Sequence, residues 1–363
     1  MKEAMVVVGT RPEIVKMAPV IRALQKNATP SIFTHCGQHY DYNMSQQFIE
    51  DLELPMPEYS YRLKGSSQGA QTAQIITHME RLLEKAHPAV VLVEGDTNGV
   101  LATALAAVKL GIPVGHVEAG LRSFDLRMPE EHNRRLTDHI STYLFAPTEK
   151  ASINLERENV WGKTYVTGNT VIDAVAQHMK IAEKKSQVMK NLHFERYALA
   201  TAHRAENVDN VAVLKGFLEA FAEAPIPVVC PMHPRTKKRL HRSKSCARAL
   251  KSENLQILPP QGYLDFLVLM RNCEMIVTDS GGIQEEATAP AIRKHVLVIR
   301  LSTERPEAVD TGFAEVVGVR RQDILTAIER LLKNRKELPS TSPYGDGHAA
   351  ERIVNIIRDE MCF

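Results

Sequence analysis

The sequence has few of the features that mark disulfide-bonded or membrane proteins. Its five cysteines are odd in number, widely separated and free of C-x-x-C pairs, so neither a disulfide framework nor a cysteine zinc site is expected. No apolar run approaches the roughly 18 residues that span a bilayer, and the apolar run at 4–8 is too short for a signal peptide. We therefore expect a cytoplasmic protein with no membrane partner.

Charge of one sign is not in excess either. The 363 residues include 45 Lys and Arg against 43 Asp and Glu, a formal net charge of +2. Bulk attraction to nucleic acid is therefore not expected, whereas a small anion held by a few placed cations is compatible with this balance. Hydrophobic residues make up 44% of the chain, and its length suffices for two domains with separate cores.

Two common site motifs are missing as well. The P-loop pattern G-x-x-x-x-G-K-[ST] and the metalloprotease pattern H-E-x-x-H do not occur. The segment 345–350 fits the dinucleotide pattern G-x-G-x-x-A, but it follows a polar loop and not a strand, so it does not predict a nicotinamide site. Neither a metal nor a redox cofactor is therefore expected.

Short apolar runs alternate with segments of helical periodicity along most of the chain. This alternation predicts an α/β fold with parallel sheets, and two successive series of strands predict two doubly wound domains. We place the break near 167–170, so that the domains cover 1–169 and 170–347. The predicted strands are 5–8, 31–35, 89–93, 113–117 and 143–145, then 197–200, 227–230, 255–258, 275–277 and 296–299.

The segment after the first predicted strand begins a helix. Thr10 and Glu13 have capping-box spacing, and Pro12 suits a first helical turn. Arg11, beside the free N–H groups, and Lys16, one turn on, also make this helix start a candidate anion site.

Acidic residues follow later strands of the first half. Parallel sheets bind ligands outside the carboxyl ends of their strands, and with two such domains we expect the site in the cleft between them. Carboxylates that converge there raise one another's pKa values, as proton transfer requires. The acidic positions are Glu94 and Asp96, then Glu118, then Glu130 and Glu131.

The second half has the features of a phosphate site. The strand 197–200 is followed by His203 and Arg204, a pairing suited to an anion. The segment 278–287 follows strand 275–277 and opens a helix, where Gly281 and Gly282 let backbone N–H groups approach a diphosphate. Glu286, further along that helix, is placed to accept the hydroxyls of a ribose.

Taken together, these segments resemble the non-hydrolysing UDP-N-acetylglucosamine 2-epimerases over almost the whole chain. The resemblance implies a GT-B fold with two Rossmann-like domains, a homodimer, and a final helix at about 348–363 that packs on the N-terminal domain. The shared motifs occur in the family's order: G-T-R-P-E at 9–13, G-Q-H at 37–39, E-G-D-T at 94–97, H-V-E-A-G-L-R at 116–122, P-E-E at 129–131, T-G-N-T at 167–170, D-S-G-G-I-Q-E-E-A at 279–287 and E-R-P-E-A-V at 304–309.

The resemblance also implies UDP-GlcNAc and UDP-ManNAc as substrates and a role for each matching residue. The implied catalytic set is Asp96, Glu118, Glu130 and His203. The implied substrate-binding residues are Arg11, Lys16 and Arg305 for phosphate or sugar, Ser280, Gly281 and Gly282 for the diphosphate, Glu286 for the ribose, and Gln261 and Phe266 for the uracil.

The family reaction inverts C2 of a sugar whose proton has no neighbouring carbonyl to activate it. Elimination of UDP to 2-acetamidoglucal, followed by re-addition, needs acids, bases and a stabilised diphosphate, which this inventory supplies. Which carboxylate acts on which face stays open, because crowded acids titrate together. A hydrolysing relative that releases ManNAc and UDP, a GT-B glycosyltransferase and a catalytically silent nucleotide-sugar sensor are the alternatives.

Some segments depart from the family pattern. Ala205 stands where many bacterial relatives carry a second Arg, and the segments 40–43 and 233–235 also differ. In those relatives UDP-GlcNAc is also an activator bound beside the active site, and these changes fall near that second pocket. The resemblance therefore does not predict whether this chain is activated. The connector 288–295 is longer than the family's usual P-x-L-G-K-P.

Overall fold

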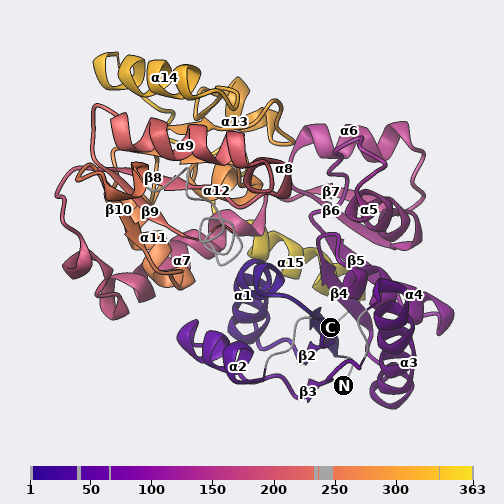
Figure 1. Cartoon of the computed structure of the whole chain (residues 1–363). Helices are drawn as coiled ribbons and strands as arrows, with labels where there is room; N and C mark the ends of the chain where they lie inside the picture. Colours follow the sequence, from indigo (N-terminus) through magenta and orange to yellow (C-terminus); the bar gives the residue numbers. More distant parts are fainter. Residues whose placement is uncertain are drawn as a thin grey trace. The chain divides into compact units, whose positions relative to one another are not determined.

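The computed structural model describes residues 3–38, 42–64, 67–232, 236, 248–334 and 336–361. Within these ranges the chain forms two compact α/β units (Figure 1). Unit 1 comprises Met1–Ala174 and Tyr344–Phe363, and unit 2 comprises Val175–Pro343. The motif residues 39–41 and 233–235 lie outside the described residues.

Unit 1 is built on a parallel sheet with the strand order β3-β2-β1-β4-β5-β6-β7. The central strands β1 and β4 are buried along their whole length, as expected for apolar strands that helices cover on both faces. The strands are β1 (Ala4–Val8), β2 (Ser31–His35), β3 (Tyr59–Ser60), β4 (Val90–Glu94), β5 (Val114–Val117), β6 (Tyr143–Ala146) and β7 (Lys163–Val166).

Side-chain caps begin several helices of unit 1. The Thr97 hydroxyl accepts a hydrogen bond from Val100 N, and the Ser67 hydroxyl accepts one from Ala70 N. Each cap satisfies one backbone N–H group that the first turn leaves unpaired. The helices are α1 (Arg11–Lys26), α2 (Tyr42–Asp51), α3 (Gln68–Ala86), α4 (Asn98–Lys109), α5 (Pro129–Ile140), α6 (Glu149–Arg157) and α15 (Ala349–Met361).

The last helix of the chain belongs to unit 1. Helix α15 packs against α1, at the opposite end of the sequence (Figure 1). The chain passes from unit 1 to unit 2 inside α7 (Thr170–Lys185), between residues 174 and 175, whereas the sequence predicted the break at 169/170. The carboxylate of Asp173 accepts hydrogen bonds from Ala349 N at 3.2 Å and Ala350 N at 2.9 Å and so ties the start of α7 to α15.

Unit 2 has a second parallel sheet, with the order β10-β9-β8-β11-β12-β13. Its main core joins the apolar faces of helices α9 and α14 to the strands, and Phe217, Phe221 and Ile328 are fully buried there. The predicted fold class, two doubly wound parallel sheets, is confirmed. The elements are β8 (Ala198–Thr201), α8 (Ala205–Val208), α9 (Val211–Glu223), β9 (Val228–Pro231), β10 (Leu255–Leu258), α11 (Tyr263–Asn272), β11 (Met275–Thr278), α12 (Gly281–Glu286), β12 (Val296–Val298), α13 (Pro306–Asp310), β13 (Ala314–Val316), α14 (Arg321–Lys333) and the short 3₁₀ helices Val188–Asn191 and Ala249–Lys251.

None of the helices in the described ranges combines the length and the apolar composition that crossing a bilayer requires. The longest among them, α3, has 19 residues and many polar side chains.

Gly120, two residues after Glu118, is required by both its conformation and its surroundings. Its φ is +82°, and a Cβ atom there would lie 2.2 Å from the carbonyl oxygen of Ala151. We expect Gly120→Ala to lower the free energy of unfolding by about 1–2 kcal/mol for the left-handed backbone and by about 1–3 kcal/mol more for the clash. Urea titrations of the full chain measure this loss.

Gly111 supplies the matched control for this substitution. It has a similar φ of +69°, but nothing lies within 4 Å of its virtual Cβ. Gly111→Ala should therefore show only the backbone part of the cost. Equal losses for the two variants would contradict the packing of Gly120 against Ala151.

Candidate active site

Each sheet reverses its strand order at one point. The reversal lies between β1 and β4 in unit 1 and between β8 and β11 in unit 2. Doubly wound sheets bind ligands at the carboxyl ends of the strands that flank such a point. The loops after these four strands, together with the helices that follow them, hold most of the residues singled out from the sequence.

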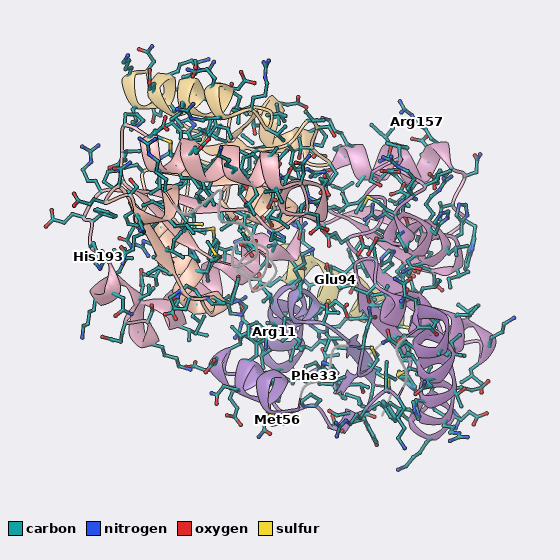
Figure 2. All side chains as sticks on the ribbon, viewed as in Figure 1. Arg11, Phe33, Met56, Glu94, Arg157 and His193 are labelled. Atoms are coloured by element: carbon teal, nitrogen blue, oxygen red, sulfur yellow. The ribbon has the colours of Figure 1, made fainter. Side chains whose placement is uncertain are left out.

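Lys16 joins two buried carboxylates in unit 1. Its ammonium lies 3.0 Å from Glu94 Oε1 and also donates to Glu118 Oε2, while Asn169 Nδ2 donates to Glu118 Oε1 at 3.2 Å. The side chains of Glu94 and Glu118 are only 2% and 5% exposed, and Figure 2 marks the position of Glu94 in unit 1. Glu118 has a φ of +70°, a costly conformation that holds its side chain at the carboxyl end of β5.

The pKa of Glu94 is strongly shifted by its surroundings. Burial raises its pKa well above the ordinary value; Lys16 opposes this rise, and the negative charge of Glu118 adds to it. Lys16 therefore lies among carboxylates in this structure, and its predicted contact with substrate stays a prediction.

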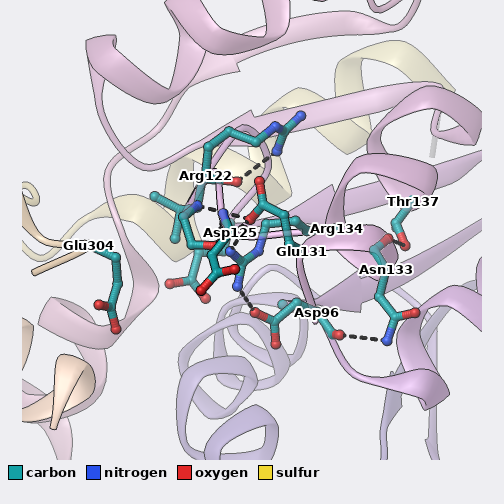
Figure 3. A network of polar contacts seen from close by, with 12 residues as sticks. Asp96, Arg122, Asp125, Glu131, Asn133, Arg134, Thr137 and Glu304 are labelled. Carbon is teal, nitrogen blue, oxygen red and sulfur yellow. Dashed lines mark hydrogen bonds and ion pairs between the residues drawn. The ribbon is translucent and has the colours of Figure 1, made fainter. Parts of the chain in front are cut away.

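Asp96 lies in the loop after β4 and is held from α5. Its carboxylate pairs with Arg134, and its backbone oxygen accepts a hydrogen bond from Asn133 Nδ2 at 3.0 Å (Figure 3). The side chain of Asp96 is 34% exposed, so this acid is both oriented and accessible to a ligand.

Neighbouring acids at the start of α5 have opposite environments. Glu131 is fully buried and accepts hydrogen bonds from Ser123 N and Oγ, while Arg134 Nη1 donates to it at 2.6 Å (Figure 3). Burial raises the pKa of Glu131, but these hydrogen bonds and the Arg134 charge outweigh it, so the pKa lies below its ordinary value. Glu130, which the resemblance marks as catalytic, is exposed on the first turn.

A buried network of polar side chains supports the loops that carry Asp96 and Glu118. His116 Nδ1 lies 2.7 Å from Asp138 Oδ1, and His116 Nε2 lies 2.8 Å from the carbonyl oxygen of Gly95. Asp138 also pairs with Arg122 at 2.8 Å and accepts from Gly120 N. Sequence reasoning missed Asp138, because no motif marks it.

The segment after β1 differs from a standard capping box. Thr10 makes no side-chain cap; its hydroxyl donates to Glu13 Oε1 at 2.8 Å, while Gly9 N donates to Glu13 Oε2 at 2.6 Å. Burial raises the pKa of Glu13 to about 7. Arg11 is exposed, and its guanidinium lies 5.6 Å from the centre of the Phe48 ring.

In unit 2, Asp279 organises the loops after β8 and β11. Its carboxylate accepts from Arg204 N at 2.9 Å and from Asn207 Nδ2 at 3.1 Å, and it lies 3.1 Å from His203 Nδ1. Burial raises the pKa of Asp279, but the contacts with His203 and the other donors outweigh it and lower the pKa. His203 is thereby oriented while its side chain stays 40% exposed.

Arginines gather beside the start of α12. Glu304 pairs with Arg204 at 2.6 Å and with Arg300 at 2.5 Å, and Arg305 Nε lies 2.5 Å from Glu285 Oε1. Burial raises the pKa of Glu304, but the charges of the three arginines outweigh it and lower the pKa to about 2. The guanidiniums of Arg204, Arg300 and Arg305 are thus gathered and oriented by carboxylates beside the start of α12, and such groups can bind an anion.

The remaining residues predicted to bind substrate lie on the same unit. Ser280 is the N-cap of α12, which begins with Gly281 and Gly282 and ends at the half-buried Glu286. Gln261 and Phe266 lie further away along the sheet, in the β10–α11 loop and in α11; both are half-buried. Sequence reasoning missed Arg300 and did not predict that Glu304 pairs with arginines. The one signal for Arg300 was that it follows the predicted strand 296–299.

The raised pKa of Glu13 predicts a pH dependence of stability. A carboxyl whose pKa is about 7 in the folded chain and 4.5 when unfolded stabilises the fold fully below about pH 4.5, and this contribution is lost as the pH rises through about 7. Titration of Glu13 should lower the unfolding free energy of the parent chain by about 3 kcal/mol between pH 4.5 and pH 7.5. In Glu13→Gln this part of the pH dependence should be absent.

Urea titrations at several pH values between 4.5 and 7.5 measure this difference. Glu84→Gln, which changes an exposed acid of α3, is the control and should leave the pH dependence as it is in the parent chain. An unchanged pH dependence in Glu13→Gln would show that Glu13 does not titrate in this range.

Comparisons with known proteins cover nearly the whole chain. The family model for UDP-N-acetylglucosamine 2-epimerase matches residues 22–358. A UDP-N-acetylglucosamine 2-epimerase from Methanocaldococcus jannaschii is 45% identical over 361 residues, which cover 97% of this chain and 98% of that protein. A UDP-2,3-diacetamido-2,3-dideoxy-D-glucuronate 2-epimerase from Pseudomonas aeruginosa is 37% identical over 359 residues, with 97% and 98% covered.

A solved structure gives the same result for the fold. The crystal structure of the M. jannaschii UDP-GlcNAc 2-epimerase in complex with UDP-GlcNAc and UDP matches with a TM-score of 0.86 and 45% identity, and the match covers 99% of this chain and 100% of that one. The GT-B fold class and the family expected from the sequence are therefore both confirmed. The chain belongs to the UDP-N-acetylglucosamine 2-epimerase family.

Proposed function

We propose that this protein interconverts UDP-GlcNAc and UDP-ManNAc without releasing free sugar. The observation that carries the proposal is the set of oriented carboxylates at the ends of β4 and β5, where Lys16 pairs with Glu118 and Arg134 pairs with Asp96. The name of the M. jannaschii relative, and the UDP-GlcNAc and UDP in its crystal structure, support the choice of substrate.

The chemistry requires both an acid–base set and an anion site. The C2 proton is removed as the C1–O bond breaks, so the electron pair of the C–H bond forms the double bond of 2-acetamidoglucal and UDP leaves with the C1–O electrons. Protonation of C2 from the opposite face and return of UDP to C1 give the epimer. Unit 1 supplies carboxylates for the proton transfers, and the arginine cluster of unit 2 would stabilise the departing diphosphate.

We assign roles by joining these geometries to the family motifs. The proposed proton-transfer and positioning residues are Asp96, Glu118, Glu130 and His203. The side chains of Asp96 and His203 are partly exposed and can reach a ligand. The proposed binding residues are Arg11, Lys16 and Arg305 for phosphate or sugar, Ser280, Gly281 and Gly282 for the diphosphate, Glu286 for the ribose, and Gln261 and Phe266 for the uracil. The route uses no cofactor, and a homodimer stays a prediction.

Solvent deuterium separates this function from its alternatives. When the protein is incubated with UDP-GlcNAc in heavy water, we expect it to form UDP-ManNAc that carries deuterium at C2. Proton NMR measures this labelling. A hydrolysing enzyme would accumulate ManNAc and UDP, and a glycosyltransferase or a silent sensor would leave C2 unlabelled; each result would reject the proposal. The same assay with UDP-2,3-diacetamido-2,3-dideoxy-D-glucuronate tests the substrate of the P. aeruginosa relative.

Asp96→Asn should lower the rate of deuterium incorporation by about 10²-fold or more, because it removes a proton-transfer group. Asp359→Asn, which changes an exposed acid of α15, is the control and should keep the parental rate. A fully active Asp96→Asn would remove Asp96 from the proposed set.

The neighbouring acids of α5 give a second test. Glu130→Gln should lower turnover while leaving the unfolding free energy unchanged, because Glu130 is exposed. Glu131→Gln should lower the unfolding free energy by about 2 kcal/mol, because a buried acceptor of several hydrogen bonds loses part of them. Kinetics and urea titrations of both variants measure these effects. An active Glu130→Gln variant would contradict the assigned role of Glu130.

A further inference from the structure

Glu94 is a buried carboxyl to which the family motifs gave no role in this chain. It is the last residue of β4 and pairs in register with Val117 of β5, the residue before Glu118. Its side chain is 2% exposed and lies 3.0 Å from the ammonium of Lys16. Glu94 therefore lies directly beside the proposed proton-transfer site.

Among the residues that the structure describes, the charges that act on Glu94 do not balance if every group is ionised. Lys16 and Glu13 face it from α1, and Glu118 faces it from the loop after β5, whereas the neighbouring strand β1 is entirely apolar. Two carboxylates thus compete for one ammonium, with a third acid nearby. Burying an excess negative charge is costly, so the Glu94–Glu118 pair retains a proton. Burial and the two other acids raise the pKa of Glu94, in agreement with this count.

The hydrogen-bond donors indicate which acid carries the proton. Glu118 receives hydrogen bonds from Lys16 Nζ and from Asn169 Nδ2, the latter at 3.2 Å. Donors of this kind stabilise the ionised form of a carboxyl. Glu94 makes a longer contact with the same ammonium and is the more buried of the two. The proton therefore resides on Glu94.

We propose that Glu94 is a positioning residue that carries the shared proton of the Glu94–Glu118 pair and so keeps Glu118 ionised beside Lys16 at neutral pH. When Glu118 removes the C2 proton, the C–H bond breaks and an O–H bond forms on Glu118. The pair then holds two protons; because another group protonates C2 from the opposite face, the pair returns to its starting state by releasing one proton to solvent. This account of turnover rests on the proposed function, whereas the protonation of Glu94 in the free protein does not.

Infrared spectroscopy of the full chain tests the protonation without reference to catalysis. Because the pKa of Glu13 is about 7, this second buried acid is first removed by Glu13→Gln. At pH 7 the Glu13→Gln protein should show the carbonyl stretch of a protonated carboxylic acid, shifted by ¹³C-glutamate labelling and absent once Glu94→Gln is added. Glu84→Gln, which changes an exposed acid, is the control and should leave the band in place. A Glu13→Gln protein without this band, or a band that persists when Glu94→Gln is added, would overturn the inference.

Kinetics of two further variants test the positioning role. Glu94→Gln mimics the protonated acid, so kcat should stay within about threefold of the parent value and the acidic limb of the pH profile should not move. Glu94→Leu has a similar size but no donor, and its kcat should fall by about tenfold or more with little change in KM. A shift of the acidic limb to lower pH in Glu94→Gln would show that Glu94 is normally ionised and would reject the proposal.

An inactive parent protein in the deuterium assay would reject the proposed function but not the infrared result. Conversely, an active enzyme without the carboxylic-acid band would keep the function and reject the role of Glu94. The two failures are therefore distinguishable.

Discussion

A single half-buried ammonium connects two buried acids of unit 1. Lys16 extends from α1 to Glu94 at the end of β4 and to Glu118 after β5, so one cation connects three elements of the fold. Without it, two carboxylates less than 6% exposed would lie side by side, which a protein interior does not tolerate when both are ionised. The position of α1 on the sheet and the chemistry of the loops thus depend on the same contact.

The loops beyond this contact are held by a second buried network. His116 fixes the carbonyl oxygen of Gly95, and Asp138 fixes both His116 and the amide of Gly120. Each loop next to a proposed acid is therefore fastened through its backbone, which leaves Asp96 accessible while Glu118 keeps its strained backbone. Unit 2 follows a related principle, because Asp279 and Glu304 hold His203 and the arginines in place.

Much of the site was predictable because motif residues follow buried strands. The order of acids after β4 and β5, and of His203 and the glycines after β8 and β11, could be read from apolar runs and the residues that end them. The supporting partners could not be read in this way. Asp138 is 22 residues from His116, and Glu304 is 100 residues from Arg204, so no local pattern connects them. Glu130 and Glu131 are adjacent residues of one motif, and the sequence does not distinguish them. Only the structure shows that Glu130 is exposed and Glu131 is buried.

Local pattern was enough for the fold class, the family and the loops where chemistry is placed, since strand periodicity and motif order are properties of short segments. The partner of each charge, its burial and hence its protonation depended on how distant segments pack. Asp173 bonded to the start of α15, Lys16 between two acids and Glu13 with a pKa of about 7 all arise this way. The physical reason is that desolvation and Coulomb interactions depend on distance in space, and distance along the chain does not specify it.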